Sequence, residues 1–106
     1  MADLKKLAEE MAAGKITTLV ILGGNPVYDA PADLEFGAAM KKVAATIHLS
    51  VSQNETSALA KWHLPEAHYL EAWGDARALD GTASVQQPLI RPLYGGKTAA
   101  EVLAAL

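Results

Sequence analysis

The chain has 106 residues, of which 51% are hydrophobic, so it has room for one small domain with a core of its own. Nine Lys and Arg against twelve Asp and Glu give a net charge of −3, which excludes the basic field that gathers nucleic acid or anionic lipid. The absence of Cys excludes disulfides, thiolate metal sites and a cysteine nucleophile. The apolar run Leu19 to Leu22, like every other apolar run in the sequence, is far too short for a membrane span.

The first half of the chain alternates helical and strand patterns. Residues Ala2 to Ala13 place apolar side chains at three- and four-residue spacing and predict an amphipathic helix that stops near Gly14. The apolar runs Thr17 to Leu22 and Ala45 to Val51 predict two buried strands, and Ala32 to Lys42 predicts a helix between them. This order favours right-handed crossovers and a parallel sheet.

The second half of the chain has a weaker periodicity. Asn54 to Lys61 predicts a short helix capped by Asn54, and Trp62 to Leu64 a third short strand. Residues His68 to Gly81 predict an irregular excursion with turns. Ser84 to Ile90 predicts an edge strand, because it contains a proline.

A last helix is predicted over Thr98 to Leu106, because Thr98 and Glu101 have the spacing of a capping box. Together these elements predict an α/β fold. We expect residues 1–106 to form a single small three-layer Rossmann-like domain with a mostly parallel sheet.

The segment Gly23-Gly24-Asn25-Pro26 follows the first strand, at the edge where open α/β sheets bind ligands. Asn25 could exchange hydrogen bonds with a base, a ribose or a phosphate. The segment matches neither GxGxxG nor a P-loop, so a tight turn without a ligand is an equally good interpretation.

The other chemistry-bearing residues form no recognisable motif. His63 and His68 do not fit a helical metal motif, and His48 is interpreted as a hydrogen-bonded structural residue of the second strand. No serine stands in a GxSxG context. Trp62 and Trp73 are interpreted as core and interface anchors. Four acidic residues are better explained by turns and solvation than by paired catalytic carboxylates: Glu66, Glu71, Asp75 and Asp80.

Three blocks in order resemble the second Rossmann-like domain of the molybdopterin oxidoreductases, the dimethyl sulfoxide reductase family. They are TLVILGGNPVYDAP (Thr18 to Pro31), ATIHLSV (Ala45 to Val51) and NETSALAKWHLPEAHYLEAWGDARALDGTASVQQPLIRPL (Asn54 to Leu93). The resemblance extends from Ile16 to Leu106. The sequence is most similar to the cofactor-less relatives, the B subunits of alternative complex III, a membrane-attached quinol-oxidising respiratory complex.

In active members of this family the domain helps to hold a guanine dinucleotide tail of the molybdenum cofactor. The resemblance assigns two groups of residues to the family's ligand-facing loops, as cofactor-binding positions that are vestigial in this chain: Gly24, Asn25 and Pro26 in the first loop, and Glu55, Thr56 and Ser57 in the second.

The sequence departs from the family at the positions that read the cofactor. His48-Leu49 stands where the family has Gln-Asp, and Leu49 cannot accept from the N1 and N2 donors of guanine. Lys61 replaces a family Asp, and Thr82 replaces an Arg suited to phosphate. We therefore expect no cofactor and no metal in this chain, while a longer parent could still hold molybdopterin guanine dinucleotide.

The resemblance predicts a non-catalytic structural and docking domain of a molybdopterin-oxidoreductase-like respiratory electron-transfer subunit. We expect this domain to be an excised or separately encoded part of that longer parent protein. We expect the isolated chain to lack catalysis, although the parent resembles an oxidoreductase. Its partners would be other parent domains and respiratory-complex subunits, with the parent at the periplasmic face of the membrane. The sequence of the chain itself does not indicate a localisation.

Two alternatives stay open at this point. The chain could be a domain of an active molybdenum oxidoreductase that binds the guanine dinucleotide tail, with Asn25, Thr56 and Asp75 replacing the lost contacts. It could also be an autonomous flavodoxin-like or nucleotide-binding domain.

Overall fold

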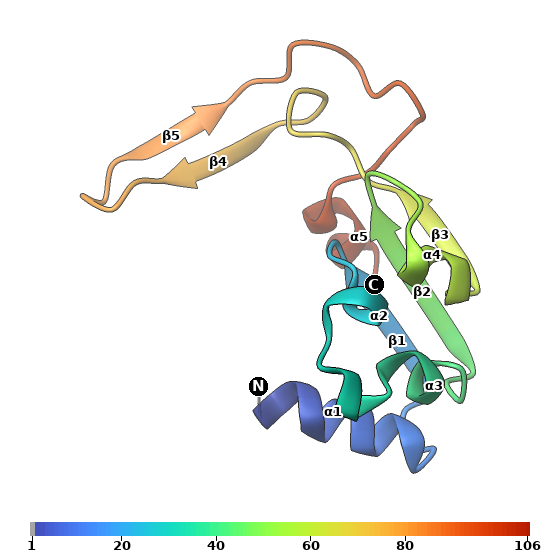
Figure 1. Cartoon of the computed structure of the whole chain (residues 1–106). Coiled ribbons are helices and arrows are strands. Elements are labelled where there is room, and N and C mark those ends of the chain that lie inside the picture. Colours follow the sequence, from blue (N-terminus) through green and yellow to red (C-terminus); the bar gives the residue numbers. More distant parts are fainter. Residues whose placement is uncertain (1) are drawn as a thin grey trace. The chain divides into compact units, whose positions relative to one another are not determined.

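The computed structural model describes residues 2–106, which divide after Leu64 into two compact units (Figure 1). The first unit contains a three-stranded parallel sheet with its connecting helices, and the second contains a two-stranded hairpin and a helix. The predicted α/β fold with a parallel sheet is confirmed.

The sheet of the first unit has the strand order β1-β2-β3. Strands β1 and β2 are parallel, and their register runs from the pair Thr18↔Ala45 to the pair Leu22↔Leu49. The carboxyl ends of β1 and β2 therefore lie at the same sheet edge. The elements are α1 (Ala2–Ala12), β1 (Thr18–Leu22), α2 (Pro26–Asp29), a 3-10 helix (Ala32–Leu34), α3 (Phe36–Met40), β2 (Ala45–Ser50), α4 (Glu55–Leu59) and β3 (Trp62–Pro65).

The apolar core of the first unit lies where α1 contacts α3. Met11 of α1 and Met40 of α3 are buried there, together with Leu19 of β1. The sequence period predicts this burial, because the apolar positions of α1 fall on one face. The buried core residues are Ala8, Met11, Leu19, Phe36, Ala39, Met40 and Val43.

The predicted continuous helix over Ala32 to Lys42 is wrong. Glu35 adopts a left-handed conformation with φ 44°, which separates the 3-10 helix from α3. The break redirects the chain so that Phe36 and Met40 are buried in the core, while Leu34 is only partly buried. Burial of α3 thus outweighs the cost of a left-handed non-glycine residue, which is about 1–2 kcal/mol.

The second unit contains β4 (Gly74–Arg77), β5 (Ala83–Gln86) and α5 (Ala99–Ala105). Strands β4 and β5 are antiparallel. Lys97 forms a parallel bridge to Glu66, and a Cβ atom at Gly96 would lie 2.9 Å from the backbone nitrogen of Ala67, so this approach requires a glycine. The predicted capping box of α5 is confirmed, because the side chains of Thr98 and Glu101 each accept from the other's backbone N–H.

Two interpretations of the second half of the sequence need correction. The stretch expected to be irregular contains β4, and the turn that connects it to β5 is closed by the hydrogen bond from the Gly81 N–H to the Ala78 carbonyl. Trp62 and Trp73 are not core residues, because they are 66% and 65% exposed. Within residues 2–106, no helix has both the length and the apolar character that a membrane crossing needs.

Candidate functional site at the carboxyl ends of β1 and β2

The two loops singled out in the sequence come together at one edge of the sheet. The backbone N–H of Gly23, just beyond β1, donates to the carbonyl of Leu49 in β2 at 2.7 Å. Gly24 then adopts φ +72°, a conformation that favours glycine, and the chain turns into α2. This turn places Asn25 next to the first turn of α4.

The side-chain amide of Asn25 is hydrogen-bonded to α4 through both its nitrogen and its oxygen. Its Nδ2 donates to Glu55 Oε2 at 2.6 Å. Its Oδ1 accepts from the backbone N–H of Thr56 at 3.1 Å and from Thr56 Oγ1 at 2.7 Å. Because both lone-pair sites of the carbonyl oxygen are occupied, Asn25 has no acceptor left for a ligand.

Thr56 closes the connection back to α2. Its side chain is completely buried, and its Oγ1 accepts from the backbone N–H of Val27 at 3.0 Å. The hydroxyl therefore donates to Asn25 Oδ1 and accepts from the backbone N–H of Val27. Both of its hydrogen-bonding roles stay within the protein, which holds the two loops as one network.

His48 of β2 lies beneath this network and is completely buried. Its Nε2 is 3.1 Å from the carbonyl oxygen of Gly24, and a carbonyl only accepts, so this nitrogen carries a proton. Its Nδ1 lies 2.9 Å from the hydroxyl oxygen of Ser57, and that hydroxyl donates to Asn54 Oδ1 at 3.3 Å. The expectation of a hydrogen-bonded structural histidine is confirmed, and His48 links β2 to both loops.

The contact between Ser57 and His48 has the distance of a nucleophile and its base, so its surroundings matter. Ser57 is only 8% exposed, and its backbone N–H, which could otherwise stabilise an oxyanion, donates to Asn54 Oδ1 at 3.1 Å. Asn54 is the N-cap of α4, as predicted. The geometry is that of a structural tie between β2 and α4.

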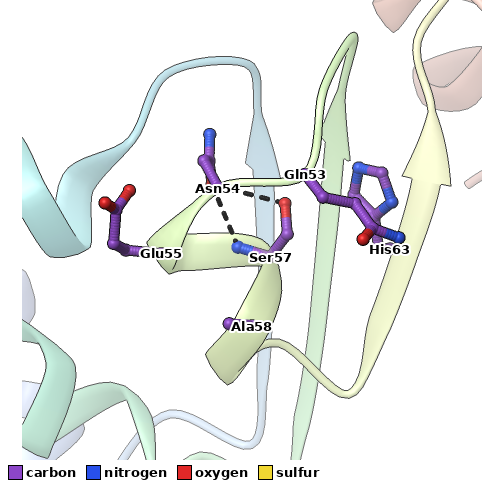
Figure 2. A pocket seen from close by; sticks show the side chains of 6 residues that line it. All are labelled: Gln53, Asn54, Glu55, Ser57, Ala58 and His63. Atoms are coloured by element: carbon purple, nitrogen blue, oxygen red, sulfur yellow. Dashed lines mark hydrogen bonds between the residues drawn. The ribbon is translucent and has the colours of Figure 1, made fainter.

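A surface pocket of about 410 Å³ lies beside these loops (Figure 2). In Figure 2, Glu55 and His63 stand at opposite ends of the labelled group, with Asn54 and Ser57 between them. The hydroxyl of Ser50 donates to the carbonyl of Ser52, so His63 Nε2, 3.2 Å from Ser50 Oγ, is the donor of that contact. The pocket is lined by Gln53, Asn54, Glu55, Ser57, Ala58 and His63.

The electrostatics of this edge oppose an anionic ligand. The hydrogen bond from Asn25, followed by that from its own backbone N–H, lowers the pKa of Glu55, so this carboxylate is charged at neutral pH. Neither 23–27 nor 52–58 contains a Lys or Arg. Leu49, at the position where the resemblance leads one to expect an Asp, is completely buried and presents no polar side-chain group. These residues do not fit the diphosphate and guanine of a dinucleotide tail.

The acidic candidates belong to the second unit. The carboxylate of Glu71 accepts from the backbone N–H groups of His68 and Leu93, and Asp80 accepts from that of Thr82. Asp80 thus serves its turn, as expected. Across the described residues 2–106, no group of three or more His, Asp or Glu side chains is placed to hold a metal ion.

Sequence reasoning missed the central position of His48 and the place of His63 in the pocket. The sequence signal at this point is the apolar Leu49, which directs attention away from its neighbour His48. Spacing along the chain gives no indication that His48 contacts Gly24 and Ser57, because these partners are 24 and 9 residues away.

No protein-family model matches this sequence, and no curated protein is significantly similar to it. The resemblance to the molybdopterin oxidoreductases therefore stays a prediction based on the residues quoted above.

Proposed function

We propose that this chain is a non-catalytic structural and docking domain of a larger, molybdopterin-oxidoreductase-like respiratory electron-transfer subunit. The observation that carries the proposal is the pairing of the two ligand-facing loops with each other. Asn25 and Thr56 stand at the positions assigned to cofactor binding, and their polar atoms bond to each other, to Glu55 and to Val27.

Charge supports the same conclusion. A bound dinucleotide tail would bring a diphosphate to this edge, where Glu55 is charged and neither 23–27 nor 52–58 contains a Lys or Arg. A ligand that donates to the Asn25 carbonyl oxygen would have to displace the bonds which that oxygen accepts from Thr56. Each buried donor or acceptor that loses its hydrogen bond costs about 1–3 kcal/mol, and this cost opposes binding of the ligand.

Docking is supported by the second unit, which exposes large apolar side chains. A domain that folds to work alone seldom exposes so many of them, and their presence favours a surface that other protein covers. We propose other domains of the parent chain and respiratory-complex subunits as that protein. The exposed residues include Tyr69, Trp73, Leu89, Leu93 and Tyr94.

A second candidate is a domain that binds the guanine dinucleotide tail within an active parent. The pocket of about 410 Å³ beside the loops favours it, because this volume is within the range of small-molecule sites. In that case Asn25 and Thr56 would exchange their present partners for the ligand.

Chemical-shift mapping with GDP tests the proposal. We expect no saturable change in the amide signals of the two loops, whereas saturable micromolar binding at Gly24 to Pro26 and Glu55 to Ser57 would contradict it. The Glu55→Gln variant is titrated in parallel. Binding by the variant alone would identify the carboxylate as the group that excludes the nucleotide and would leave the proposal standing.

Metal and pterin analysis of the full-length parent separates the two candidates. We expect a parent without molybdenum and pterin. A parent that contains both would favour the second candidate.

A further inference from the structure

The hairpin of the second unit has a free backbone edge along β4. The backbone N–H of Ala78 donates to the carbonyl of Thr82 at 2.9 Å, so these two residues form a hydrogen-bonded pair. Bonded pairs alternate along an antiparallel ladder, and the register makes Ala76↔Ser84 the next one. The N–H and C=O groups of Asp75 and Arg77 therefore point away from β5.

The hairpin is also incomplete as a sheet. All four residues of β4 are exposed, and in β5 only Gln86 is partly covered. A two-stranded hairpin is at best marginally stable in water, and a third strand or a covering layer normally completes it. In the described part of the chain the one ion pair joins Lys97 to Glu101, so neither Asp75 nor Arg77 has an ion-pair partner there.

The sequence of β4 is complementary to itself. When two β4 strands lie antiparallel with Ala76 on the two-fold axis, Asp75 of one copy faces Arg77 of the other, and the reverse pair follows by symmetry. Both residues present their backbone groups at this edge. The pairing therefore forms four backbone hydrogen bonds and two cross-strand pairs of opposite charge.

The other edge of the hairpin offers no such match. Along β5 the outward backbone groups belong to Ala83 and Val85, and pairing about Ser84 would place these two apolar residues opposite each other. In addition, the side chain of Gln86, at the end of β5, is already held by the carbonyl of Tyr69. Charge complementarity thus selects β4.

We propose that this chain forms a two-fold symmetric dimer in which the β4 edges of two copies pair antiparallel about Ala76. The product is a four-stranded sheet with the order β5-β4-β4-β5. The proposal does not depend on the proposed function, because it rests only on the hairpin.

Charge reversal tests the dimer by sedimentation equilibrium over a range of protein concentrations. In Arg77→Asp, Asp75 faces an aspartate of the second copy, and two attractive pairs become repulsive. We expect self-association to weaken by about tenfold or more. The double variant Asp75→Arg with Arg77→Asp restores opposite charges across the axis, and we expect it to associate as the wild type does.

The control is Arg91→Asp, which changes the net charge by the same amount at an exposed position outside both strands. It should leave the dimer intact. Circular dichroism of each variant checks that the fold is retained. The proposal is overturned by a chain that stays monomeric up to about millimolar concentration, by equal effects of Arg77→Asp and Arg91→Asp, or by a double variant that fails to restore association. Association that responds to Val85→Lys and not to the charges of β4 would also overturn it.

Discussion

The core of the first unit and the hairpin of the second differ in what surrounds their side chains. Met11, Met40, His48 and Thr56 of the first unit are at most 1% exposed, and each polar group among them bonds to another residue of that unit. In the hairpin, Val85 is 77% exposed and Leu79 is fully exposed. The first unit is thus specified by its own interior, whereas the residues of the hairpin strands have almost no interior of their own.

The largest expected effect follows from emptying the core. Met40→Ala removes a side chain that is 1% exposed, and we expect the free energy of unfolding of the first unit to fall by about 2–5 kcal/mol. Urea unfolding followed by the amide signals of β1 and β2 measures the change.

Leu79→Ala is the matched control in the hairpin. The Leu79 side chain is fully exposed to solvent, so the free energy of unfolding should change by no more than about 0.5 kcal/mol. Equal losses in the two variants would mean that Leu79 is covered in solution, and the contrast between the two regions would not hold.

An intermediate effect is expected from the polar network. Asn25→Ala leaves the backbone N–H and hydroxyl of buried Thr56 without their acceptor, and the cost is about 1–3 kcal/mol. Urea unfolding measures it, with Gln53→Ala, at an exposed position of the neighbouring loop, as the control. A loss no larger than that of the control would show that the loops are not held together through Asn25.

The sequence predicts the regular parts of the fold well because their signals are local. Apolar spacing identifies α1, β-branched runs identify β1 and β2, and Thr98 with Glu101 identifies the start of α5. The break at Glu35 could not be predicted, because it results from the burial of Phe36 against residues distant in the chain. The hairpin does have a local signal in Asp80-Gly81, but the same turn residues also suit an irregular loop, so the strands on either side are not predicted from them.

The candidate site was only partly predictable, for the same reason. Both loops were identified, because each follows a strand whose carboxyl end could be located. Their pairing depends on hydrogen bonds over about thirty residues, such as Asn25 to Glu55, and no spacing rule relates them. Whether a polar loop is open to a ligand or satisfied within the protein is therefore decided by tertiary structure.

The smallest expected effect concerns pH. The pKa of Glu55 is lowered, first by the Asn25 amide and then by its own backbone, and that of Glu101 is lowered first by the backbone N–H of Thr98. A carboxyl group with a lower pKa in the folded state stabilises the protein above its unfolded pKa, and this contribution is lost as pH falls through the folded value. In Glu55→Gln, the free energy of unfolding should therefore fall slightly less than in the wild type as the pH is lowered.

Carbon-13 titration of the carboxyl groups gives this prediction a resolved test. In Asn25→Ala, the pKa of Glu55 should rise toward its ordinary value, because its first stabilising donor is gone, while the pKa of Glu101 stays where it is. Thr98→Ser should leave both groups unchanged, since it keeps the backbone donor of the capping box. A Glu55 that titrates identically with and without the Asn25 amide would mean that this hydrogen bond does not persist in solution. The two loops would then be available to a ligand after all.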